Sequence, residues 1–160
     1  MSEELKKYIR SVKDFPKQGI VFRDITTLLK DPVALKLTLK ELYKNCENLN
    51  ISKVIGIEAR GFFFGAMLAD ELNVGFAPIR KPGKLPAATE TQSYTLEYGE
   101  DKIEIHKDAI TAGDKVLLHD DLLATGGTAC AATKLIEKLG GKIVQISFII
   151  ELSFLTGRKL

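Results

Sequence analysis

The 160-residue sequence lacks the features of several large classes of protein. No apolar run reaches the ~18 residues that a membrane span needs, and the charged first residues lack the apolar core of a secretory signal. Lys and Arg number 23 against 21 Asp and Glu, so the net charge of +2 offers no general attraction to nucleic acid. We therefore expect a cytoplasmic protein with neither a membrane nor a nucleic acid as partner.

Cysteine is scarce as well. Only Cys46 and Cys130 occur, both within predicted helices, and neither has metal-ligand spacing around it. We expect two buried thiols in a reducing compartment. Hydrophobic residues still make up 45% of the chain, which is enough for one core, so residues 1–160 are predicted to form a single domain.

The spacing of apolar residues predicts an α/β fold. Helical spacing over residues 2–13 predicts a first helix capped by Ser2, residues 17–29 are expected to be irregular, and Asp31-Pro32 predicts the start of a second helix. Strands are then predicted at residues 54–57, 76–79, 116–118 and 142–150, and helices at residues 61–72 and 128–139. This alternation favours an open parallel sheet with helices on both faces.

Residues 80–108 interrupt the alternation. Tyr94, Leu96 and Tyr98 alternate with polar residues, turn residues follow at 99–101, and Ile103 and Ile105 alternate again. The pattern predicts a protruding antiparallel hairpin. Because a long insertion of this kind is expected to make no core contacts, residues 81–107 are predicted to act as a flexible lid.

The strongest chemical signal lies in residues 116–128, where an apolar strand leads through two acids into a glycine-rich turn and a helix. Bare backbone N–H groups at a helix N-terminus bind phosphate. The residues expected to hold a phosphate monoester are Ala124, Thr125, Gly126, Gly127 and Thr128. The turn lacks the Gly-Lys-Ser or Gly-Lys-Thr ending of a Walker loop.

Asp120 and Asp121 would repel this phosphate unless they face other groups. Ribose hydroxyls and a magnesium shell are natural partners for carboxylates. The predicted ligand is therefore a sugar phosphate. A capped turn with two solvated acids is the alternative that the pattern leaves open.

Residues 116–128 resemble the phosphoribosyl diphosphate motif of the type I phosphoribosyltransferases, although His119 stands where an apolar residue is usual and is expected to be structural. Five further segments match the adenine phosphoribosyltransferases in order and spacing: Phe15-Pro16, residues 19–25 (GIVFRDI), 58–62 (EARGF), 80–86 (RKPGKLP) and 96–99 (LEYG). The resemblance implies the type I phosphoribosyltransferase fold, a small base-binding hood in residues 1–30 and a homodimer.

The resemblance also implies two binding sites. Diphosphate is expected at Glu58, Ala59, Arg60, Gly61, Arg80, Lys81 and Lys84. The family often has a cis peptide at the place of Glu58-Ala59, and the sequence leaves the form of this bond open. Adenine is expected at Val21, Phe22 and Arg23. Taken alone, residues 58–61 also fit an ordinary helix N-terminus, Lys84 a solvated loop cation and Phe22 a core residue.

The implied reaction joins adenine to 5-phosphoribosyl 1-diphosphate and gives AMP and diphosphate, with Mg2+ held mainly by the substrate near Asp120 and Asp121. Glu97 is implied to handle a proton on the purine, and Tyr98 to help close the lid; by pattern alone, Glu97 is a polar-face strand residue. The alternatives are transfer to another purine base, a regulator that senses the sugar diphosphate without catalysis, and a structural module that binds nucleotide.

Overall fold

The computed structural model describes residues 3–96 and 99–159. In chain order the elements are α1 (Glu3–Lys6), β1 (Arg10–Lys13), β2 (Val21–Asp24), α2 (Thr26–Leu29), α3 (Pro32–Lys44), β3 (Lys53–Ile57), α4 (Gly61–Glu71), β4 (Gly75–Ile79), β5 (Thr89–Leu96), β6 (Gly99–His106), β7 (Lys115–Leu123), α5 (Gly127–Lys138), β8 (Lys142–Glu151) and η1 (Gly157–Lys159). None of the helices in these two ranges is long and apolar enough to cross a membrane.

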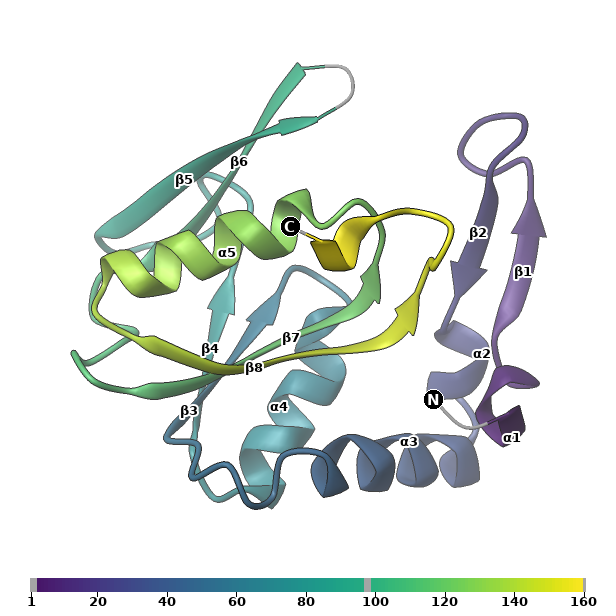
Figure 1. The fold of residues 1–160 in the computed structure, drawn as a ribbon, viewed down its shortest axis with the longest axis horizontal. Coiled ribbons are helices and arrows are strands. Elements are labelled where there is room, and N and C mark those ends of the chain that lie inside the picture. Colours follow the sequence, from purple (N-terminus) through teal and green to yellow (C-terminus); the bar gives the residue numbers. More distant parts are fainter. Residues whose placement is uncertain (1–2, 97–98, 160) are drawn as a thin grey trace.

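A four-stranded parallel sheet forms the centre of the molecule, with the strand order β4-β3-β7-β8 (Figure 1). Successive residues of a strand face opposite sides of the sheet. Val54 and Leu117 accordingly pack into a cluster with α3 and α4, whereas Ile55 and Leu118 pack into a second cluster with α5. Helices thus cover both faces, and the predicted open parallel sheet is confirmed.

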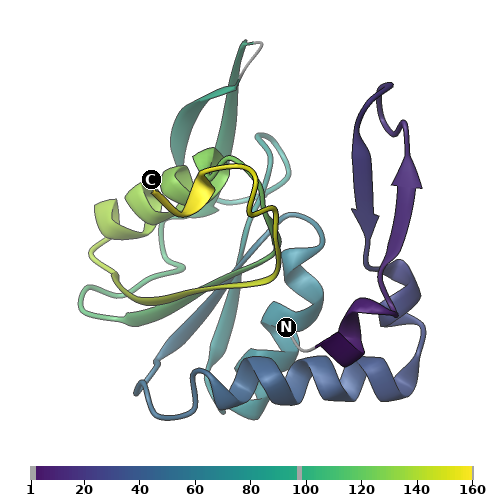
Figure 2. The same ribbon diagram turned by 45° about the vertical axis from the view of Figure 1, so that its right-hand side comes forward.

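The predicted helix over residues 2–13 is wrong. Of the described residues in this range, only those of α1 form a helix, and β1 pairs antiparallel with β2. β2 lies within residues 17–29, which were expected to be irregular. Backbone pairing between the two segments outweighs the helical spacing of their apolar residues, because tertiary contacts override local propensity. The β1–β2 hairpin stands beside the sheet and extends beyond the same edge as β5 and β6 (Figures 1 and 2).

Asp24 joins the two strands of this hairpin to α2. Its carboxylate accepts hydrogen bonds from Arg10 Nε at 3.0 Å and from the Thr26 N–H at 2.8 Å. The Thr26 N–H contributes most, followed by Arg10, and together they lower the pKa of Asp24 from 3.8 to about 2. The ionised carboxylate therefore stabilises the base of the hairpin.

Asp24→Asn is expected to lower the free energy of unfolding at pH 7 by roughly 1 to 2 kcal/mol, a range that allows for screening at the half-exposed Arg10. Because the folded pKa lies below the unfolded one, this stabilisation is present above about pH 4 and is lost as the pH falls towards 2. Urea unfolding of both proteins at pH 7 and pH 2 measures the difference. An equal difference at the two pH values would contradict the assignment.

The β5–β6 hairpin is antiparallel, as predicted, but the expected lack of core contacts is wrong. Ile103 and Ile105 are 2% and 0% exposed and belong to the cluster that includes α5. Arg80 and Glu104 also exchange backbone hydrogen bonds of 2.9 and 2.8 Å, which tie β6 to the end of β4. The base of the hairpin is part of the core, because one face of its alternating pattern is buried there.

Three smaller predictions also need correction. β7 continues to Leu123, so both acids lie within the strand and not after it. Cys46 is buried but follows the end of α3, whereas Cys130 lies in α5 and is only partly buried. By contrast, β4 confirms the strand predicted at residues 76–79, because its edge position tolerates the N–H donor that Pro78 lacks.

Candidate active site at the carboxyl edge of the sheet

Two adjacent acids lie near the carboxyl end of β7. Asp121 is 3% exposed, and its Oδ2 lies 2.9 Å from Arg60 Nε. The Asp120 carboxylate is partly buried and accepts the Asp121 N–H at 2.8 Å. The start of α4 closes over them: a Cβ at Gly61 would lie 2.7 Å from the His119 carbonyl oxygen and 3.0 Å from Asp120 Oδ1. Only glycine allows α4 to begin so close to β7.

Burial makes this acid pair unusually hard to ionise. Burial first, and then the charge of Asp121, raises the pKa of Asp120 to about 7. Burial also raises the pKa of Asp121, although the nearby Arg60 opposes it. A group that brings positive charge or hydroxyl donors would stabilise both carboxylates. His119, directly before them, is fully buried against Phe64, and burial lowers its pKa to about 4, so its ring is neutral at pH 7.

The turn after β7 has the form expected of an anion site. Gly126 precedes α5 in the left-handed conformation, with φ of 89°, and its carbonyl accepts the Cys130 N–H at 2.9 Å. The predicted loop at residues 124–128 is therefore joined to the N-terminus of a 12-residue helix. N–H groups and the helix dipole at such a position favour a bound anion.

The segment between β3 and α4 supplies Arg60 and a second acid, Glu58. The Glu58-Ala59 peptide is cis, the form that is frequent at this place in the resembling family and that the sequence by itself does not indicate. The Glu58 carboxylate accepts Arg80 Nε at 3.2 Å, Arg80 Nη2 at 3.1 Å and the Lys81 N–H at 2.8 Å. Burial would raise the pKa of Glu58, but the hydrogen bonds from Arg80 and Lys81 outweigh it and lower the pKa. Glu58 therefore orients the cations of the neighbouring loop.

Lys81 is held by the β5–β6 hairpin. Its ammonium group pairs with Asp101 and lies 3.3 Å from the Tyr94 hydroxyl, which itself donates to Asp101 at 2.9 Å. Tyr94 and Asp101 are direct cross-strand partners. Lys84 is exposed, and its carbonyl accepts Arg80 Nη1 at 3.2 Å. In this arrangement the positive charge of Lys81 is already balanced by a carboxylate.

Some of these groups line one small cavity of about 150 Å³. Its lining brings together residues from six stretches of the chain: Ile57, Glu58, Ile79, Arg80, Lys81, Tyr94, Ile103, Asp120 and Thr128. Arg60, Lys84 and Asp121 are not among them. A larger, open groove of about 1040 Å³ runs along β8 and reaches Gly126 from the other side. The smaller cavity brings the acids Glu58 and Asp120 together with Arg80 and Lys81, so we place the chemistry there.

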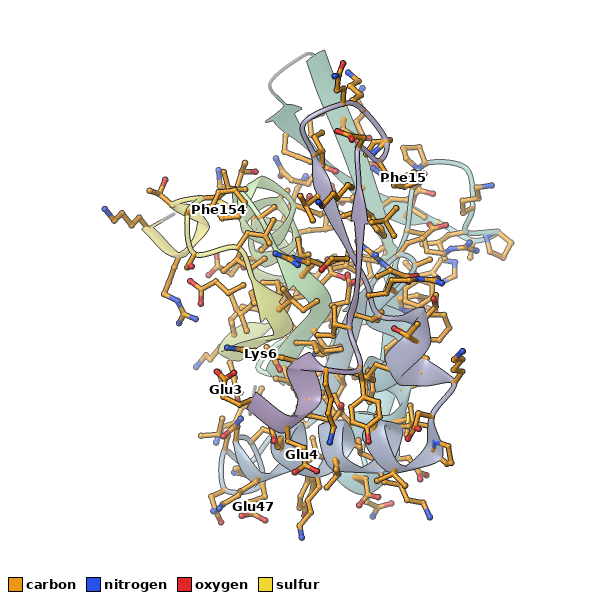
Figure 3. All side chains as sticks on the ribbon, turned by 90° about the vertical axis from the view of Figure 1, so that its right-hand side faces the viewer. Glu3, Glu4, Lys6, Phe15, Glu47 and Phe154 are labelled. Atoms are coloured by element: carbon orange, nitrogen blue, oxygen red, sulfur yellow. The ribbon has the colours of Figure 1, made fainter. Side chains whose placement is uncertain are left out.

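The β1–β2 hairpin meets this site through an aromatic ring. The Arg60 guanidinium lies 4.8 Å from the centre of the Phe22 ring, and the edge of Phe15 packs on Phe22 with ring centres 5.2 Å apart. Val21 is 44% exposed, whereas the Arg23 guanidinium turns to the Ser11 hydroxyl. Figure 3 shows Phe15 near the end of the β1–β2 hairpin. The structure thus brings Phe22 to Arg60, while the Arg23 side chain points elsewhere.

Two residues predicted for the site fall outside the described structure, and three residues beside the site were not predicted to be functional. Glu97 and Tyr98 lie outside the described residues. Sequence reasoning missed Tyr94 and Asp101, although their cross-strand pairing follows from the hairpin register. It also missed Glu104, a 7% exposed acid that accepts the Gly83 N–H at 2.9 Å and so fixes the loop carrying Lys81. Because Glu104 alternates with Ile103 and Ile105, its position predicts the polar face of the strand, and no local signal indicates its burial.

Comparison with known proteins defines the class. Residues 26–153 match the family model described as the phosphoribosyl transferase domain. An adenine phosphoribosyltransferase from Christiangramia forsetii is 60% identical over 154 residues, which cover 96% of this chain and 90% of that protein. This chain therefore belongs to the phosphoribosyltransferase family and, within it, to the adenine phosphoribosyltransferases.

Solved structures of adenine phosphoribosyltransferases are similar to this chain over nearly its whole length. The crystal structure of an adenine phosphoribosyltransferase from Thermoanaerobacter pseudethanolicus is 54% identical, with a TM-score of 0.96 and coverage of 98% of this chain and 91% of that chain. The enzyme from Saccharomyces cerevisiae, complexed with an imino-altritol bisphosphate and adenine, is 40% identical, with a TM-score of 0.92 and coverage of 98% and 92%. The whole architecture, including both hairpins, thus has solved counterparts.

Proposed function

We propose that this chain transfers the 5-phosphoribosyl group from 5-phosphoribosyl 1-diphosphate to adenine, giving AMP and diphosphate for purine salvage. The observation that carries the proposal is the cavity in which Asp120 and Thr128 of the sugar phosphate motif meet Glu58, Arg80 and Lys81. The adenine in the complex of the yeast relative supports adenine as the acceptor base.

The loop at residues 124–128 binds the 5′-phosphate of the substrate. Its N–H groups, with the hydroxyls of Thr125 and Thr128, surround the phosphate oxygens at the positive end of α5. Asp120 and Asp121 then accept hydrogen bonds from the ribose hydroxyls. The raised pKa values of both acids support this role, because hydroxyl donors and the growing positive charge of the sugar both stabilise carboxylates.

Cations from the segments that follow β3 and β4 bind the diphosphate. Arg60 and Gly61 offer a guanidinium and a close backbone approach, and Arg80, Lys81 and Lys84 come from the loop that Glu58 holds. Charge builds on the departing diphosphate as its bond to the sugar breaks, so these groups stabilise the transition state. Lys81 must exchange Asp101 for the diphosphate, which links its release to movement of the hairpin.

Magnesium fits this site as a partner of the substrate. Within the described residues, no three His, Cys, Asp or Glu side chains gather into a metal cage. Asp120 and Asp121 still offer oxygen donors whose ionised forms a cation would favour. Mg2+ bound with the diphosphate would supply further positive charge to the leaving group.

The hood, residues 1–30, covers the base. Phe22 offers an apolar face, and the backbone groups of Val21 and Arg23 read the edge of adenine. A base with the wrong edge leaves buried polar groups unpaired, at about 1 to 3 kcal/mol per group. Glu97 handles the purine proton and Tyr98 helps to close residues 81–107 over the site, so that water cannot hydrolyse the activated sugar.

We further propose that residues 1–160 act as one domain, in a cytoplasmic homodimer. Both cysteines are free, which supports a reducing compartment. Phe63 on α4 is 49% exposed and offers apolar surface for a partner subunit. Light scattering at micromolar concentration tests the dimer, and a mass of about 18 kDa would contradict it.

A base competition assay tests the function. With 5-phosphoribosyl 1-diphosphate and magnesium, we expect AMP formation from adenine to exceed nucleotide formation from guanine and hypoxanthine by about 100-fold or more in kcat/KM. Equal use of the three bases would indicate a transferase for another purine. Binding of the sugar diphosphate without turnover would indicate a sensor or a nucleotide-binding module.

A further inference from the structure

The segment after β8 lies directly behind the proposed 5′-phosphate loop. This segment, residues 152–159, contains η1 and is attached to β7, since the Leu152 N–H donates to the Leu123 carbonyl at 2.9 Å. Figure 1 shows the yellow ribbon passing beside the start of α5. Phe154 projects from the segment and is 78% exposed (Figure 3), whereas Gly157 is buried.

Gly157 touches the backbone of the loop. A Cβ at this position would lie 2.2 Å from the Ala124 carbonyl oxygen, 3.0 Å from the Gly126 nitrogen and 3.0 Å from the Thr125 carbonyl carbon. A Cβ atom essentially never lies within 3.0 Å of a non-bonded heavy atom, and backbone atoms cannot rotate away as a side chain can. Space, and not backbone conformation, therefore requires glycine at position 157.

The segment is held on its other side as well. Arg158 Nε donates to Glu151 Oε1 at 2.9 Å, at the end of β8. The Leu155 N–H donates to the Leu152 carbonyl at 2.8 Å, and the Lys159 N–H to the Thr156 carbonyl at 2.9 Å. Residues 152–159 thus form a fixed turn, and the loop rests against it.

We propose that Gly157 is a positioning residue for the 5′-phosphate loop. It lets residues 152–159 support Ala124, Thr125 and Gly126 from behind, so that their backbone groups keep the spacing that a phosphate monoester requires. The inference depends on the proposed role of the loop in binding the 5′-phosphate. A side chain at position 157 forces either the loop forward or the turn away, and both remove the support.

Gly157→Ala tests the proposal, with Gly75→Ala as the matched control. Neither glycine has positive φ, and a Cβ at Gly75 meets only the Lys53 side chain at an ordinary 3.7 Å. We expect Gly157→Ala to weaken ribose 5-phosphate binding, measured by calorimetry, and to raise KM for 5-phosphoribosyl 1-diphosphate, each by about tenfold or more. KM for adenine should change less than about twofold, and Gly75→Ala should match the wild type.

Two results of the variant experiment would overturn the proposal. One is unchanged ribose 5-phosphate binding by a folded Gly157→Ala protein. The other is an equal rise in KM for 5-phosphoribosyl 1-diphosphate and KM for adenine, since a general loss of structure would weaken the binding of both substrates.

Hydrogen exchange on the wild-type protein provides a test that does not depend on the variant's folding. Ribose 5-phosphate is expected to protect amides in residues 124–128 and in residues 152–159. Protection of the loop alone would contradict the role of Gly157 and leave the phosphate site intact. Protection of neither segment, with ribose 5-phosphate bound, would contradict the proposed phosphate site itself.

Discussion

Replacing Asp121 with Asn is expected to lower kcat/KM for 5-phosphoribosyl 1-diphosphate by about 100-fold or more. The substitution removes the charge that favours a positive sugar and leaves Arg60, 2.9 Å away, without its carboxylate. Asn has almost the same volume, and burial already makes the charge of Asp121 costly. We therefore expect the melting temperature to change by only a few degrees.

Initial rates over a range of sugar diphosphate concentrations measure this effect. Asp70→Asn is the matched control, because it makes the same change of charge at an exposed position of α4. The control should keep wild-type kinetics. An Asp121→Asn enzyme with more than half of the wild-type kcat/KM would show that this acid does not face the sugar.

Shortening the tip of the β5–β6 hairpin is expected to abolish transfer while the fold survives. Tyr94 and Asp101 are cross-strand partners, so a two-residue Asn-Gly turn can replace residues 95–100 without changing the register. The change removes Glu97 and Tyr98 but keeps Tyr94 and Asp101, which hold the Lys81 ammonium group. We expect a loss of about 100-fold or more in AMP formation, because the residues proposed to handle the purine proton and to help close the lid are both removed.

Ile103→Ala is the contrasting variant at the base of the same hairpin. Its side chain is 2% exposed, so truncation is expected to lower the free energy of unfolding by about 2 to 5 kcal/mol. Denaturant unfolding and the rate of AMP formation should be measured for both variants. If the shortened hairpin keeps more than a tenth of the wild-type rate, its tip is not the lid.

The central sheet and the loop could be predicted because their signals are local. Short apolar runs that alternate with amphipathic helices leave few arrangements other than a parallel sheet. The glycines at 126 and 127 follow the acids after one short stretch, residues 122–125, so one segment contains both halves of the proposed sugar phosphate site. Residues 58–61 and 80–84 are separate in sequence, and only the fold brings Glu58 to Arg80.

The two hairpins show why the remaining structure could not be read from the chain. In residues 2–13 the apolar side chains fit a helix, and nothing local reveals that β2 will pair with β1. At Ile103 and Ile105 the alternation was read correctly, but a period of two does not tell whether one face meets solvent or the core. The position of Gly157 behind the loop likewise depends on a contact across some 30 residues of sequence, which no pattern encodes.

A crystal structure of the protein with AMP tests whether residues 124–128 bind the 5′-phosphate. We expect the phosphate against the backbone N–H groups of residues 125–128, with the ribose hydroxyls at Asp120 and Asp121 and the base under Phe22. AMP bound in the groove along β8, with the loop at residues 124–128 making no contact with phosphate, would contradict it.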